Sequence, residues 1–251
     1  MAERAAHTLL EDAQASAVEG PRTDAVRAVA SRLVCASLAA AAERGDDWEA
    51  LSRLRIVVSA KPICQAYSLA DGTIILYEGA LDALDDEVAE GDTAEWEAGV
   101  ARLLSHEIAH LAALHGAERA NALPVYAALA AALPLAPVTA TAAAAAWLLG
   151  SELPRLRHLE LEADAVGARM MKAAGYDPKT AVLSLRHRHF APEIRDILPG
   201  GLDEMIPGIA HTVIPSVFSS HPTDCERADT LEAMLDGASY ASAAMSGSPL
   251  M

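Results

Sequence analysis

Two histidines with three residues between them lie inside a long apolar stretch of helical character. They are the ends of the pentapeptide HEIAH, from His106 to His110, within residues 99–114. Side chains four residues apart share one face of an α-helix, so both imidazoles can reach a single divalent metal ion. Glu107 projects close enough to act on a water molecule at such an ion. The stretch therefore predicts a metal-binding helix, with two surface histidines on an amphipathic helix as the alternative.

The composition favours a mainly helical chain. Of the 251 residues, 52% are hydrophobic and 4% are aromatic, and the apolar excess is mostly alanine. Such sequences are typical of closely packed helices, because sandwiches and barrels use more aromatic side chains. We expect an α+β fold, predominantly helical, with a small β-sheet. Its expected parts are an N-terminal helical scaffold over residues 1–48, one large domain over 49–236 and a poorly ordered tail over 237–251.

Hydrophobic periodicity and turn residues place the elements along the chain. Two β-branched runs predict strands over 55–59 and 73–77, and the turn Asp71-Gly72 leads into the second. An acidic loop is expected over 89–97, before the helix with the two histidines, and a loop region over 191–215. The other helices are expected over residues 2–18, 22–44, 81–88, 152–174, 179–190 and 224–236.

The charge of the chain excludes one class of partner. There are 35 acidic and 19 basic residues, and the formal net charge is −16. A chain with this charge repels phosphate backbones, so nucleic acid is not expected as a partner. The cysteines are odd in number and widely spaced, at Cys35, Cys64 and Cys225, which predicts neither a disulfide framework nor a cysteine-based zinc site.

Two segments bear on the location of the protein. The N-terminus lacks the positive charge and the early apolar run of a signal peptide, which favours the cytoplasm or the interior of an organelle. Residues 122–150 are almost uninterruptedly apolar and long enough to cross a bilayer, but Pro134 and Pro137 divide them. A helical hairpin packed on the protein is at least as well supported, and peripheral membrane contact stays open.

A catalytic zinc site needs a third protein ligand and one open coordination position. Glu160 offers this ligand, in the segment ELEAD of a second predicted helix. Asp164 lies one turn further on the same face, so it can hold the imidazole of a ligand histidine. Glu162 points to another side of the helix and is expected to be solvated. The pattern predicts one Zn²⁺ per chain, bound by His106, His110 and Glu160.

The other histidines near these motifs are expected to play no part in metal binding. His115, five residues after His110, is expected to cap the helix or to face solvent, because a fourth protein ligand would fill the open position. His158, His187 and His189 are expected to face solvent, the last two within a basic patch.

Together the motifs resemble metallopeptidase family M48, the gluzincins related to HtpX and the CaaX prenyl protease. HEIAH followed by ELEAD carries the metal-site part of this resemblance. Residues 66–79 are similar to a strand and turn of the family, and Ser220-His221-Pro222 with Arg227 resembles its late His-Pro-x-x-x-x-Arg motif. The resemblance spans about residues 50–236. The OMA-type and BepA-like branch of the family fits best, because the chain lacks clear transmembrane helices.

The resemblance implies a zinc-dependent endopeptidase with a role in protein quality control. Zinc would polarise the scissile carbonyl, while Glu107 takes a proton from water and passes it to the leaving amine. His221 would lie near the metal, as a transition-state donor or as a gate, and Arg227 would orient that segment. Substrates would be unfolded or membrane-associated polypeptides, bound in extended form along an edge strand made of Thr73, Ile74, Ile75, Leu76 and Tyr77.

Two other classes of function stay open. One is a proteolytically silent, zinc-bound module that holds client proteins as a chaperone does, with His221 closing the site. Cleavage of a protein substrate would separate it from an enzyme. The other is an alanine-rich scaffold at a membrane surface, in which the histidines are incidental and no stoichiometric zinc is bound.

Overall fold

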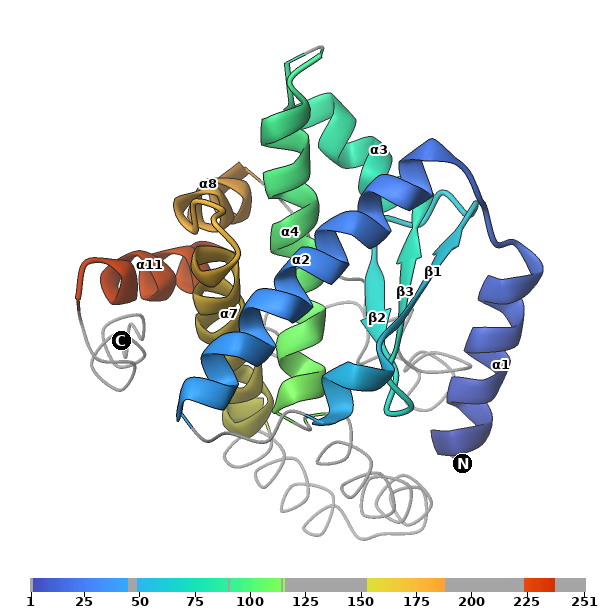
Figure 1. Cartoon of the computed structure of the whole chain (residues 1–251), viewed down its shortest axis with the longest axis horizontal. Helices are drawn as coiled ribbons and strands as arrows, with labels where there is room; N and C mark the ends of the chain where they lie inside the picture. The colour runs from blue at the N-terminus through green and yellow to red at the C-terminus, as the bar shows by residue number, and fades with distance from the viewer. Residues whose placement is uncertain are drawn as a thin grey trace, which may run out of the picture. The chain divides into compact units, whose positions relative to one another are not determined.

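The computed structural model describes residues 2–44, 49–89, 91–113, 115, 153–187 and 224–237. Within these residues the chain is mostly helical and has one small sheet, as Figure 1 shows, so the α+β class is confirmed at this level. Apart from the start of the helix with the two histidines, the expected helices agree with the observed ones to within a few residues. The elements are α1 (Ala2–Ala15), α2 (Pro21–Arg44), the 3₁₀ helix η1 (Glu49–Arg53), β1 (Arg55–Ser59), β2 (Ala66–Ser68), β3 (Thr73–Tyr77), α3 (Glu78–Glu87), α4 (Thr93–Ala112), α7 (Leu153–Ala173), α8 (Lys179–His187) and α11 (Asp224–Leu235).

The chain divides into two compact units. The first is Met1–Ala120 with Glu162–Ser184, and the second is Asn121–Leu161 with Leu185–Met251. The sheet and the helices α1 to α4 belong to the first unit, and α11 belongs to the second. Two of the boundaries between the units fall inside helices, after Leu161 in α7 and after Ser184 in α8. Both helices are continuous across these boundaries. The boundaries expected from the sequence, between the helical scaffold and the large domain after residue 48 and between that domain and the tail after residue 236, stay predictions.

The sheet of the first unit has three strands in the order β1-β3-β2. β1 runs parallel to β3, and β2 pairs with β3 in the antiparallel direction. All five side chains of β3 are buried. Two further hydrogen bonds extend the pairing beside β2, from the Tyr77 N–H to the Gln65 carbonyl (3.3 Å) and from the Leu69 N–H to the Thr73 carbonyl (2.8 Å). β3 is therefore the central strand.

The central place of β3 corrects one prediction. Thr73, Ile74, Ile75, Leu76 and Tyr77 form a strand as expected, but they do not form an exposed edge that could bind substrate. Their backbone groups already bond to β1 on one side and to β2 on the other, so an extended peptide cannot pair with this strand. The strand that covers it, β2, has three residues, which are too few to show an alternating pattern of apolar and polar side chains.

The helix α1 packs on the sheet. Its Ala13 is fully buried in one cluster with Ile75 and Tyr77 of β3. After α1 the chain continues along the outer side of β1, where the Val18 N–H donates to the Val58 carbonyl at 2.8 Å. This segment covers part of the outer edge of β1, which protects the edge from pairing with another chain.

The helix α4 carries the two histidines of the HEIAH motif and packs against α2, α3 and β2. In Figure 1, α2 crosses over α4. α4 begins at Thr93 because Asp92 caps it by accepting a hydrogen bond from the Glu95 N–H at 3.0 Å. The loop expected over 89–97 is therefore shorter than predicted. Residues buried along α4 include Val100, Leu104, Ile108 and Leu111 on one side and Ala101, Ser105 and Ala109 on another, so the helix is packed on more than one face.

Several predicted features lie outside the described residues. They are the apolar segment 122–150, the loop region 191–215 and all but the first residue of the tail 237–251. None of the helices in the described ranges combines the length and the apolar character that a bilayer crossing requires.

The packing of α1 on the sheet can be tested by overfilling it. We expect Ala13→Leu to lower the free energy of unfolding by about 1–3 kcal/mol, because the added carbons enter a filled cluster. Ala15→Leu places the same side chain at an exposed position of the same helix, so its stability should stay within about 0.5 kcal/mol of the wild type. Urea denaturation measures both values, and equal stabilities would contradict the observed packing.

Candidate metal centre

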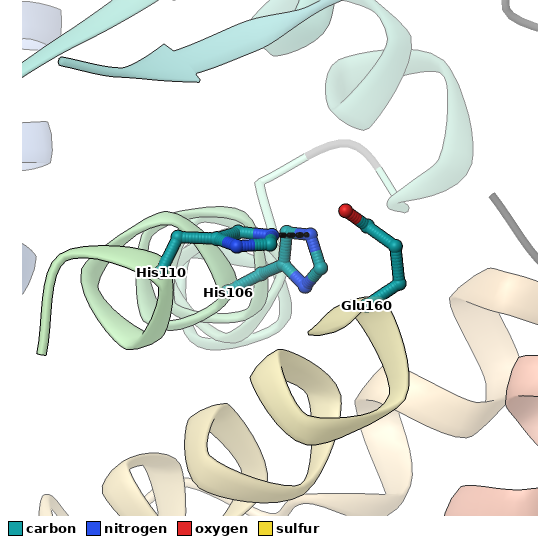
Figure 2. A group of neighbouring side chains, drawn as sticks. All are labelled: His106, His110 and Glu160. Carbon is teal, nitrogen blue, oxygen red and sulfur yellow. Dashed lines mark hydrogen bonds between the residues drawn. The ribbon is translucent and has the colours of Figure 1, made fainter. Parts of the chain in front are cut away.

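Two histidines of α4 and a glutamate of α7 form a compact group of possible ligands. The ligand atoms of His106, His110 and Glu160 all lie within 4.8 Å of one another. The Nε2 atoms of the two imidazoles are 3.2 Å apart. Figure 2 shows the Glu160 carboxylate turned toward the two rings. The structure thus brings together the three residues that the sequence predicts as metal ligands.

Glu160 reaches this group because α7 is one uninterrupted helix. Asp164, one turn after Glu160, belongs to the same unit as the two histidines. Its Oδ1 atom lies 3.0 Å from Nδ1 of His106. Residues four apart share a helix face, so the helix that delivers Asp164 to His106 also directs Glu160 toward the histidines.

A glycine allows α4 and α7 to approach each other closely beside His106. A Cβ atom at Gly167 would lie 3.2 Å from the backbone nitrogen of His106 and 3.2 Å from the carbonyl carbon and oxygen of Ser105. These neighbours are backbone atoms of a helix and cannot rotate away as the end of a side chain can. Gly167 lies three residues after Asp164, so the close approach and the bond to His106 occur in the same turn of α7.

Asp164 determines how His106 presents its ring. A carboxylate only accepts hydrogen bonds, so the proton of the neutral imidazole is on Nδ1, which donates to Asp164. The Nε2 atom then carries a lone pair and faces Nε2 of His110. The side chains of His106 and Asp164 are 17% and 9% exposed, so little water competes for this bond.

The donor set fits a zinc ion. Two imidazole nitrogens and one carboxylate oxygen are the protein ligands of a known class of catalytic zinc site, in which the fourth position stays open. Two nitrogens at about 2.0–2.1 Å from a tetrahedral ion are about 3.3 Å apart. The observed Nε2 to Nε2 distance of 3.2 Å agrees with this value. Glu160 is 1% exposed, and a cation compensates the cost of burying its charge.

Comparison with known proteins decides the family. The sequence profile of Peptidase family M48 matches residues 22–235. This chain belongs to peptidase family M48. It is also similar to the mitochondrial metalloendopeptidase OMA1 of Arabidopsis thaliana, with 30% identity over 139 residues, which cover 55% of this chain and 25% of that protein. The chain thus spans about a quarter of the length of this relative. The resemblance to the family and to its OMA-type branch is confirmed.

The remaining site residues predicted for this M48 chain lie in different places. Glu107 directly follows His106 on α4 and is partly buried. Arg227 is on α11 and is also partly buried. The neighbouring Glu226 forms an ion pair with Arg157 of α7. His221 lies outside the described residues, so its place near the metal stays a prediction.

His115 is the residue of this site that the sequence pattern placed wrongly. The pattern predicts a helix cap or a solvent-facing side chain, but His115 is 2% exposed, and its Nδ1 atom lies 2.9 Å from Nδ1 of His110. Its Nε2 atom lies 3.6 Å from Oε2 of Glu162, whose side chain is 42% exposed. Glu162 is therefore partly solvated, as expected, but it also faces a histidine. The sequence contained one signal of this contact, since His115 stands at the end of an apolar helix, five residues after the predicted ligand His110.

We expect Asp164→Asn to weaken zinc binding by about 10- to 100-fold, because His106 loses the negative charge that orients its ring. Zinc affinity can be measured by competition with a chromophoric chelator. The control Asp86→Asn makes the same change at an exposed position of α3 and should bind zinc as tightly as the wild type. An unchanged affinity in Asp164→Asn would show that the bond to His106 does not support metal binding.

The close approach of α4 and α7 gives a second prediction, in which replacing a helical glycine by alanine lowers the stability of the protein. In most helices Gly→Ala raises stability by up to about 1 kcal/mol. We expect Gly167→Ala to lower the melting temperature and to weaken zinc binding, because the new Cβ pushes His106 away from α7. Thermal unfolding of the metal-free protein and chelator competition test the two effects separately. A more stable variant with unchanged zinc affinity would contradict the close contact.

Proposed function

We propose that this chain is a zinc-dependent endopeptidase of the gluzincin type, which holds one Zn²⁺ ion with His106, His110 and Glu160. The observation that carries the proposal is the convergence of these three ligand atoms within 4.8 Å. Membership of peptidase family M48 supports it. The similarity to the mitochondrial metalloendopeptidase OMA1 also supports the proposal, although it covers only a quarter of the length of that protein.

Glu107 is the proposed general base. When bound, zinc supplies a Lewis acid that polarises the scissile carbonyl and lowers the pKa of water. Glu107 directly follows the ligand His106 on α4, and we propose that its carboxylate reaches a water molecule at the open coordination position. A carboxylate in this position takes a proton from the attacking water and passes it to the nitrogen of the leaving amine. Its partial exposure leaves a path for water to reach it.

The proposed substrate-binding edge is β2 instead of β3. Hydrogen bonds join Gln65 and Leu69 to β3 on the inner side of this strand. Backbone groups point alternately toward and away from the partner in an antiparallel pair, so those of Ala66 and Ser68 point outward. In the described part of the chain, no backbone hydrogen bond covers that outer side. β2 also contacts α4, so a peptide bound along it would run beside the helix of the histidines.

This mode of binding indicates the class of substrate. A peptide that adds to a strand must be extended, and it is held mainly by backbone groups, which all sequences share. Unfolded segments of polypeptides meet both conditions, whereas folded domains do not. We therefore propose unfolded segments of polypeptides, those of membrane-associated proteins included, as substrates and protein quality control as the role.

His221 and Arg227 complete the proposal. The motif that contains them falls inside the part of the chain that matches the family, residues 22–235. We propose that His221 approaches the metal site as a transition-state donor or as a gate, and that Arg227 orients its segment. An arginine at this place on α11 can act by pairing with an acidic side chain.

The general base gives the main test of the enzyme. We expect Glu107→Gln to bind zinc as tightly as the wild type and to cleave an unfolded protein such as casein at least about 100-fold more slowly. The amide keeps the size of the side chain but cannot take the proton. Glu95→Gln, at an exposed position in the first turn of α4, should keep full activity. Undiminished cleavage by Glu107→Gln would remove Glu107 from the mechanism.

The same measurements separate the alternatives. A wild-type chain that binds stoichiometric zinc and holds casein but never cleaves it would match the silent client-binding module. A chain that binds no zinc at all would rule out the metal centre. Activity that disappears with a zinc chelator and returns with added zinc would support the enzyme.

A further inference from the structure

A second buried imidazole lies behind the predicted ligand His110. The Nδ1 atoms of His110 and His115 are 2.9 Å apart, and both residues are almost fully buried, at 5% and 2% exposure. Beyond His115, the Oε2 atom of Glu162 lies 3.6 Å from Nε2. We propose that His115 is a positioning residue, which with Glu162 holds His110 in the tautomer and ring orientation that bind the metal. This inference rests on the proposed metal site and goes beyond it by assigning two residues outside the ligand set.

The charge of Glu162 sets the direction of this chain of contacts. The distance of 3.6 Å is longer than a hydrogen bond, so Glu162 acts on His115 through its negative charge. That charge favours the tautomer of neutral His115 with its proton on Nε2. Nδ1 of His115 then carries a lone pair and accepts a hydrogen bond from the Nδ1–H of His110. His110 is left with its own lone pair on Nε2, which is the form that binds a metal ion.

The same result follows independently for His106. Asp164 takes the Nδ1–H of that ring, so its Nε2 atom also carries a lone pair. The two lone pairs face each other at 3.2 Å. Two acceptors at this distance repel each other unless a cation lies between them. The carboxylates behind the two rings therefore prepare a site that favours a metal ion.

The opposite direction of the chain is less favourable. If Nδ1–H of His115 donated to His110, then His110 would carry its proton on Nε2 and donate it to His106. Nε2 of His115 would then direct a lone pair at the negative Glu162. This arrangement would also prevent His110 from binding a metal ion. The position of Glu162 thus selects the direction that serves the metal.

The two ligand histidines are supported unequally. His106 donates directly to Asp164, whose side chain is 9% exposed, at 3.0 Å. His110 is held by a neutral imidazole, and the carboxylate behind that imidazole is 42% exposed. Water weakens the influence of Glu162 more than that of Asp164. The direct contact of His115 with His110 therefore contributes more to metal binding than the contact with Glu162.

Two variants of His115 separate positioning from simple space filling. His115→Leu fills the volume but accepts no hydrogen bond, and we expect it to bind zinc at least about tenfold more weakly than the wild type. His115→Gln offers a carbonyl oxygen to the Nδ1–H of His110, and its affinity should stay within about threefold of the wild type. Chelator competition measures both affinities, and the melting temperature of each metal-free variant reports on folding. Equal affinities of the Leu variant and the wild type would overturn the proposal, as would a Gln variant as weak as the Leu variant.

The protonation pattern tests the proposal in the unaltered chain, even if His115→Leu does not fold. Nitrogen NMR of the zinc-loaded wild type should show protons on Nδ1 of His110 and on Nε2 of His115. A proton on Nδ1 of His115 would overturn the proposal. Glu162→Gln should weaken zinc binding by a smaller factor than His115→Leu. An equal or larger loss would contradict the smaller contribution of Glu162.

The outcomes also distinguish this inference from the proposed function. If the wild type binds zinc and cleaves casein while His115→Leu binds zinc equally well, only the role of His115 fails. If the wild type binds no zinc, the metal centre fails and the role of His115 fails with it.

Discussion

The candidate metal site depends on the close approach of two helices, α4 and α7. A Cβ atom at Gly167 would lie only 3.2 Å from backbone atoms of Ser105 and His106, so any larger residue there would push the two helices slightly apart. Metal ligands tolerate errors of about 0.5 Å at most, so helix packing must be accurate before the ligands can act together. The backbone contact at Gly167, the bond of Asp164 to His106 and the position of Glu160 are therefore parts of one constraint. A change in the helix packing would alter all three.

The strongly periodic elements of this fold were predictable from local sequence. The apolar pattern of α4 and α7 and the β-branched runs of β1 and β3 each need only neighbouring residues to be recognised. β2 was not predictable in this way, because three residues carry no pattern and the strand exists only through its pairing with β3. That pairing changed the identity of the edge strand, and with it the proposed path of the substrate. The acidic run before α4 has the composition of a loop, so the predicted start of this helix is too late, because Asp92 acts as its cap.

The ligands of the site were predictable for a different reason. The spacing of His106 and His110 and that of Glu160 and Asp164 are both one helical turn, so each helix indicates its own half of the site. Periodicity was also right that Glu162 points away from Glu160. The periodicity could not show that Glu162 faces His115, which follows the end of α4, because this contact joins residues far apart in the sequence. Contacts of this kind follow from tertiary packing and leave no local pattern.

The acidic residues of α7 give the proposed cation a role in stability as well as in chemistry. Glu160, Glu162 and Asp164 place three carboxylates within five residues, in a chain whose formal net charge is already −16. Asp164 and Glu162 face imidazoles, while Glu160 is buried beside the two Nε2 atoms. A divalent ion at that point would offset both the buried charge and the repulsion between the lone pairs. Metal binding and folding of the α4 and α7 pair are then thermodynamically coupled, since each favours the arrangement that the other requires.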